Sequence, residues 1–107
     1  AFKRVVNIIK EPETTPVQPE LLQNAAEQAL FAAFKDAEGV VEGCLAQSDY
    51  SAALEAMARL KEFIDGFFDS VLVMDKVEGV RRNRLGLLTR IRDLFARVAD
   101  FRKIQTG

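Results

Sequence analysis

The sequence contains no histidine, no tryptophan and a single cysteine among its 107 residues. The absence of histidine removes the commonest general base, the usual activator of a serine or cysteine nucleophile, and a preferred zinc ligand. Glycine-rich phosphate loops and clusters of metal ligands are also missing from the sequence. We therefore expect no catalytic residues, no metal site and no bound cofactor within this chain.

The lone cysteine and the shortness of the apolar runs bear on compartment and membranes. Cys44 cannot form an internal disulfide, which favours a reducing compartment and hence a cytoplasmic protein. Its place in an apolar helical pattern predicts a buried, unreactive thiol. No apolar run approaches the ~20 residues needed to span a bilayer, so no membrane partner is expected.

What the sequence does contain is a helical spacing of apolar residues. They recur every three or four positions over residues 2–9, 22–45, 50–71 and 77–101. A chain of this length forms one domain, and short connections between helices place neighbours antiparallel. We therefore predict an all-α fold, an antiparallel helical bundle of about four helices.

A proline-rich segment separates the first helix from the others. Pro12, Pro16 and Pro19 cannot continue a helix, and each disfavours helical geometry in the residue before it. The second helix is expected to begin near Pro19. Because the helical pattern is already present at Ala1, which is not an initiator methionine, we expect a fragment of a longer subunit. The expected organisation is a helix over residues 1–10, an extended, exposed linker over 11–19, and a helical bundle over 20–107.

Charge is unevenly distributed along the chain. Residues 76–107 hold nine Lys or Arg against three Asp or Glu, whereas residues 11–75 hold three against thirteen. The basic last helix is typical of a nucleic-acid contact, in which arginines bind phosphates and base edges. The alternative is that the acidic region pairs with these arginines inside the bundle. Composition alone leaves both interpretations open.

Arg84 differs from the other arginines because it falls on the apolar stripe of the last helix, between Val80 and Leu87. A buried guanidinium without a partner is costly, so a carboxylate should meet it. Asp69, at the end of the preceding antiparallel helix, is the nearest candidate, with Asp65 behind it. We predict a structural Arg84–Asp69 ion pair, the alternative being an arginine that contacts a base or phosphate.

Three sequence motifs resemble the C-terminal end of the β subunit of bacterial glycyl-tRNA synthetases: FFDSVLVM at residues 67–74, VRRNRLGLL at 80–88 and LFARVAD at 94–100. The opening FKRVVNIIK at residues 2–10 resembles the helix with which that domain begins. The departures are mild: Leu72, Val80 and Gly86 stand where methionine, leucine and alanine are common. That module is similar to the α-helical anticodon-binding domain of the DALR type, shared with arginyl-tRNA synthetases.

The resemblance implies a non-catalytic part of a glycine–tRNA ligase that binds the anticodon arm of tRNA(Gly). It implies as partners tRNA(Gly), the synthetase α subunit and the rest of the β subunit, with ATP and Mg²⁺ used elsewhere in the holoenzyme; no DNA partner is expected. The rival hypothesis is a helical protein–protein docking module that uses its basic last helix. The expected tRNA-binding residues are Lys3, Arg4, Asn7, Arg81, Arg82, Asn83, Arg90 and Arg97.

Overall fold

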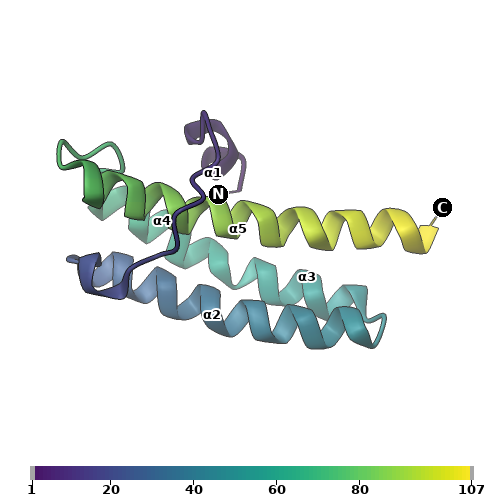
Figure 1. Ribbon diagram of the computed structural model, residues 1–107. Helices are drawn as coiled ribbons and strands as arrows, with labels where there is room; N and C mark the ends of the chain where they lie inside the picture. Colours follow the sequence, from purple (N-terminus) through teal and green to yellow (C-terminus); the bar gives the residue numbers. More distant parts are fainter. Residues whose placement is uncertain (1, 107) are drawn as a thin grey trace.

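The computed structural model describes residues 2–106, with the backbone alone for 102–106, so the expected domain ends at residues 1 and 107 lie outside it. Within this range every regular element is a helix, which confirms the all-α prediction (Figure 1). Five α-helices and one 3-10 turn follow in this order: α1 (Phe2–Ile8), η1 (Pro19–Leu21), α2 (Ala25–Ala46), α3 (Tyr50–Ala58), α4 (Leu60–Ser70) and α5 (Glu78–Thr106).

The bundle consists of three long rods and one short helix. Figure 1 shows α2 running alongside α3 and α4, with α5 lying over them and α1 on the far side of α5. The third predicted helix is interrupted at Arg59, which keeps a helical backbone (φ −65°, ψ −22°) and donates its backbone N–H to Glu55 at 3.2 Å. Helices α3 and α4 therefore continue one rod, and the bundle has four helical segments, as predicted.

The start of α2 differs from the prediction. The sequence suggested a beginning near Pro19, but Pro19–Leu21 form only a 3-10 turn and α2 begins at Ala25. The reason is a capping box: Asn24 Oδ1 accepts the Ala26 N–H at 2.8 Å, and Glu27 Oε1 accepts the Asn24 N–H at 3.2 Å. These two bonds satisfy N–H groups that the first helical turn leaves unpaired.

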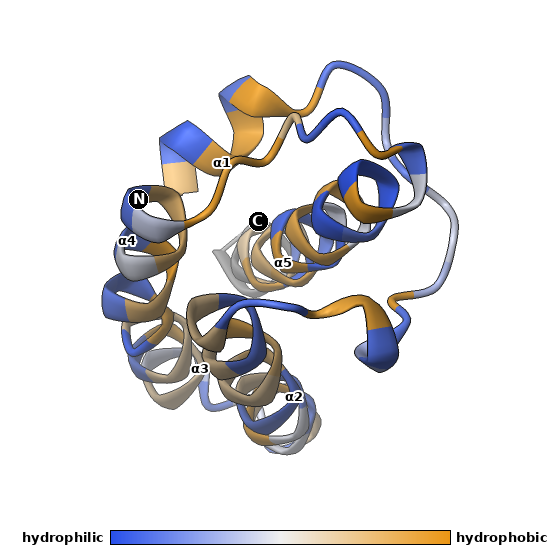
Figure 2. Cartoon of the chain, turned by 90° about the vertical axis from the view of Figure 1, so that its left-hand side faces the viewer, coloured by the Kyte–Doolittle hydropathy of each residue, from blue (hydrophilic) through white to orange (hydrophobic). Residues whose placement is uncertain are grey.

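Helix α5 is the central element of the fold. The view turned by 90° shows it in the middle of the molecule, with the other helices and the connecting segments around it (Figure 2). Because neighbours lie on several sides, the run from Gly86 to Thr89 is buried without interruption. Cys44 is only partly buried, packed at the edge of the core. The other helices contribute core residues that include Val5, Leu30, Phe34, Met57, Ile64 and Phe67.

Candidate nucleic-acid interface

Residues 13–18, here called the strap, cross the outer side of α5. The linker was expected to be extended and exposed; it is extended, but it is docked, and Val17 packs against the core. The crossing lies at Gly86, where a Cβ would stand 3.1 Å from the Thr15 carbonyl oxygen and 3.6 Å from Glu13 Cγ. A glycine at this buried position allows the strap to lie directly on the helix.

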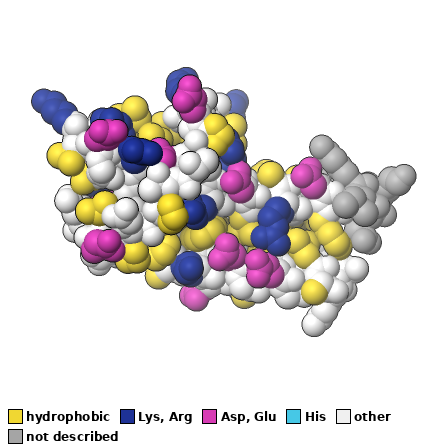
Figure 3. Space-filling view, viewed as in Figure 1, with side chains coloured by type: hydrophobic (Ala, Val, Ile, Leu, Met, Phe, Trp, Pro, Cys, Tyr) yellow, Lys and Arg dark blue, Asp and Glu magenta, His cyan; other side chains and the backbone are white. Residues whose placement is uncertain are grey.

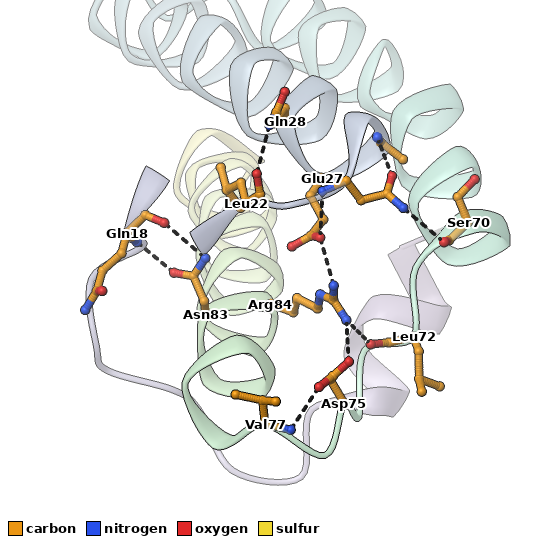
Figure 4. Close-up of polar contacts among 12 residues, drawn as sticks. Gln18, Leu22, Glu27, Gln28, Ser70, Leu72, Asp75, Val77, Asn83 and Arg84 are labelled. Atoms are coloured by element: carbon orange, nitrogen blue, oxygen red, sulfur yellow. Dashed lines mark hydrogen bonds and ion pairs between the residues drawn. The ribbon is translucent and has the colours of Figure 1, made fainter. Parts of the chain in front are cut away.

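Asn83 binds the C-terminal end of the strap through its whole carboxamide. Its Oδ1 accepts the Gln18 N–H at 2.7 Å, and its Nδ2 donates to the Gln18 carbonyl oxygen at 3.2 Å (Figure 4). The side chain is buried, so the two bonds satisfy polar groups that water cannot reach. Although predicted to contact tRNA, Asn83 holds the strap in this structure.

Two further α5 residues hold the middle and the beginning of the strap. Thr89 Oγ1 accepts the Glu13 N–H at 3.2 Å and donates to the Leu85 carbonyl oxygen at 2.8 Å. Arg90 Nη1 donates to the Thr15 carbonyl oxygen at 3.4 Å. Arg90, another predicted tRNA contact, is therefore also engaged with the chain's own backbone.

Arg82 forms a two-point contact with a strap carboxylate. Its Nε lies 3.3 Å from Glu13 Oε1, and its Nη2 lies 3.3 Å from Oε2 and 3.1 Å from the Thr15 hydroxyl. Hydrogen bonds from Arg82, and then from the Thr15 hydroxyl and N–H, lower the pKa of the Glu13 carboxyl to about 2. The same carboxylate raises the pKa of the Arg82 guanidinium. Arg82 remains 49% exposed, so this contact lies at the surface.

Arg84 is buried and paired, but its partner is not Asp69. Its Nη2 donates to Glu27 Oε1 at 2.9 Å, and its Nη1 binds the Leu72 carbonyl oxygen and lies 3.5 Å from Asp75 Oδ2 (Figure 4). Asp69 lies on the exposed side of α4. The predicted partner was therefore wrong: Glu27, in the first turn of α2, supplies the carboxylate.

The remaining predicted residues lie at the surface. Lys3, Arg4 and Asn7 share one exposed side of α1, because residues three and four apart are neighbours on a helix. The Arg4 guanidinium lies 4.4 Å above the Phe68 ring, a cation–π contact. Lys3 and Asn7 make no polar contact with the described part of the chain.

The other two predicted α5 arginines also contact the chain itself. Arg81 is half-buried and donates to the Asp75 carbonyl oxygen at 3.1 Å. Arg97 Nη1 lies 3.4 Å from Glu42 Oε1 of α2, at the surface. Figure 3 accordingly shows basic and acidic side chains close together over this face. The alternative drawn from charge, acids pairing with α5 arginines within the bundle, holds for Arg82, Arg84 and Arg97.

Sequence reasoning missed three residues that organise this region: Glu13, Glu27 and Thr89. Glu27 had a detectable signal, since Asn24 and Glu27 have the spacing of a capping box and Glu27 precedes the apolar Leu30. Glu13 and Thr89 had none, because they are 76 residues apart in the chain and their contact depends on where the strap crosses α5.

Comparison with known families tests the resemblance. The family described as DALR anticodon binding domain matches residues 1–106. The chain belongs to this family. As a DALR domain it is 53% identical over 104 residues to the glycine--tRNA ligase beta subunit of Geotalea daltonii, covering 97% of this chain and 15% of that protein. The expected resemblance is thus confirmed.

Two further relatives carry the same name. Over 104 residues the DALR domain is 49% identical to the protein from Citrifermentans bemidjiense, covering 97% of this chain and 15% of the relative. Over 108 residues it is 44% identical to the protein from Aeromonas salmonicida, covering 98% of this chain and 16% of that relative. The chain therefore spans about 15% of the length of these curated relatives. No solved structure matches it.

No helix within residues 2–106 has the length and hydropathy to cross a membrane.

Proposed function

We propose that this DALR domain binds the anticodon arm of tRNA(Gly) and positions the tRNA for aminoacylation catalysed elsewhere in a glycyl-tRNA synthetase holoenzyme. The observation that carries the proposal is the family match over residues 1–106, together with relatives named glycine--tRNA ligase beta subunit. The proposal includes the remaining β subunit and the α subunit as partners, ATP and Mg²⁺ in the holoenzyme, and a cytoplasmic location.

The cations that are not paired within the chain suggest where RNA phosphates bind first. Several exposed cations form no ion pair within the described residues, and three of them, Lys3, Arg4 and Lys10, lie together in the segment 3–10. Stacking on Phe68 occupies one face of the Arg4 guanidinium and leaves its N–H edge able to donate to a phosphate. We therefore place the primary phosphate contacts on α1, with the paired α5 arginines as a second set.

In this proposal the domain acts by orientation and not by chemistry. Contacts to phosphates set the register of the RNA and carry no sequence information, whereas base edges in a single-stranded loop supply recognition. Asn7 lies one helical turn after Lys3 and Arg4 on the same exposed side, and its carboxamide can both donate to and accept from a base edge. A rigid helical core keeps these groups in fixed positions.

The test is a titration of the chain with tRNA(Gly) and with a non-cognate tRNA at two salt concentrations. Charge reversal by Lys3→Glu and Arg4→Glu should weaken binding and reduce the salt slope by about one for each phosphate that the domain no longer binds. Lys35→Glu is the matched control, because Lys35 is an exposed cation on α2. Absence of binding to any tRNA at low salt would refute the proposal.

The docking hypothesis has one observation in its favour, namely that α5 arginines already bind carboxylates of this chain. It predicts a salt-dependent complex with a protein, and no complex with tRNA. The same titration, repeated with the synthetase α subunit in place of tRNA, therefore distinguishes the two functions.

A further inference from the structure

The carboxylate of Glu13 accepts hydrogen bonds from four donors, two on Arg82 and two on Thr15. Arg82 Nε and Nη2 each lie 3.3 Å from one of its oxygens. The Thr15 hydroxyl donates to Oε2 at 2.7 Å, and the Thr15 backbone N–H donates to the same oxygen at 3.2 Å. A guanidinium fork, a hydroxyl and a backbone N–H are the donors that proteins use to bind the oxygens of a phosphate group.

We propose that these donors form a phosphodiester-binding site on α5, which Glu13 occupies in the free chain and leaves when an RNA phosphate binds. The inference rests on the proposed function, since it assigns one phosphate contact of the bound RNA to this site. A phosphodiester and a carboxylate each carry one negative charge and two oxygens that can accept the two parallel N–H bonds of an arginine. One anion can therefore replace the other without any change in the donors.

Access and anchoring support the exchange. The Arg82 side chain is 49% exposed, whereas the Arg84 side chain is 7% exposed, so RNA can reach the first guanidinium and not the second. The strap backbone is held by bonds that do not involve the Glu13 carboxylate, to Thr89 and to Asn83. When the Glu13 side chain rotates away, Thr15 therefore keeps its position and its two donors.

The ion pair that must break is open to solvent on the arginine side. The Arg82 side chain is 49% exposed and the Glu13 side chain 14%, so water and salt can reach and screen the pair, which lowers the free energy needed to break it. The residues on either side of Glu13, Pro12 and Thr14, are exposed, so this stretch of the strap borders solvent. In the free chain Glu13 competes with other anions for these donors. Only an anion that makes additional contacts with the domain, as an RNA strand does, displaces it.

The experiment compares Glu13→Gln with Glu11→Gln in the 107-residue chain. Each variant removes one negative charge, and the two positions are two residues apart. Glu11, however, makes no ion pair or hydrogen bond within the described residues. We expect Glu13→Gln to bind tRNA(Gly) about two- to fivefold more tightly than Glu11→Gln, the range that exposed ion pairs cover. The gain should disappear when Arg82→Gln is added to Glu13→Gln. Equal affinities for the two single variants would overturn the inference.

A second probe separates this inference from the proposed function. Inorganic phosphate is added to ¹⁵N-labelled Glu13→Gln, and the Arg82 side-chain Nε–H signal is followed by NMR. A saturable shift in Glu13→Gln, weaker in Glu11→Gln, supports the site even if no tRNA binds, in which case only the proposed function fails. An unchanged Arg82 signal in Glu13→Gln overturns the site whatever the tRNA result.

Discussion

The buried ion pair between Arg84 and Glu27 allows the sharpest test of the fold. The Arg84 and Glu27 side chains are 7% and 0% exposed, and Arg84 Nη2 lies 2.9 Å from Glu27 Oε1. Glu27→Gln keeps the size of the side chain and its capping bond to Asn24 but leaves the Arg84 charge without its main counterion. Breaking a buried pair by removing one partner costs about 3–5 kcal/mol. Asp75 Oδ2, at 3.5 Å from Arg84 Nη1, offsets part of this cost. We therefore expect Glu27→Gln to lower the free energy of unfolding by about 3 kcal/mol.

The free energy of unfolding is measured by urea denaturation of each variant. A domain of this size is stable by about 5–15 kcal/mol, so the expected decrease shifts the midpoint strongly while leaving the slope m unchanged. Asp69→Asn is the matched control: it also neutralises one carboxylate, at the position that the sequence suggested as partner. Because Asp69 is exposed, its variant should stay within about 0.5 kcal/mol of the parent chain. A larger effect for Asp69→Asn than for Glu27→Gln would refute the assignment of the ion pair.

The other predictions concern the strap. Because the pKa of Glu13 is lowered to about 2, its contribution to strap docking is complete above its unfolded pKa, near 4.5, and disappears as pH falls from there towards 2. An NMR titration of the Glu13 carboxyl checks this, and a midpoint near 4.5 would contradict it. Gly86→Ala should raise hydrogen exchange at the Gln18 N–H, because the new Cβ would stand 3.1 Å from the Thr15 carbonyl oxygen. Gly79→Ala, where a Cβ meets nothing within 4 Å, is its control, and equal exchange in both variants would count against the crossing point.

Local patterns in the sequence were sufficient for the secondary structure. The three-and-four spacing of apolar residues identified every long helix, and Arg84 stood out because a charge lay on an apolar stripe. The start of α2 was misplaced because Pro19 was weighed more heavily than the Asn24–Glu27 capping box. Both signals are local, so the error was one of interpretation and not of missing information.

The partners of the arginines could not be found in the same way. The antiparallel order of the predicted helices made Asp69 the expected partner of Arg84, whereas the structure places Glu27, 57 residues away, against it. Likewise, Arg82 and Arg90 were expected to be largely free, because acids are few within their helix; of these acids, Glu78 does reach Arg82, at 3.8 Å. The strap supplies the contacts for both, from 69 and 75 residues away. Which of the predicted residues contact tRNA stays a prediction.

The sequence by itself determined the helical class of this protein and its membership of the DALR anticodon binding domain family. These depend on periodicity, composition and motifs, which are properties of neighbouring residues. Only the tertiary structure decided which basic groups remain unpaired at the surface. That outcome depends on contacts between segments far apart in the chain, since a charge is neutralised by whichever group packing brings within a few ångströms of it. The basic character of α5 can therefore be read from the sequence, whereas the structure is needed to show that the cations of α1 are exposed and form no ion pair within the described residues.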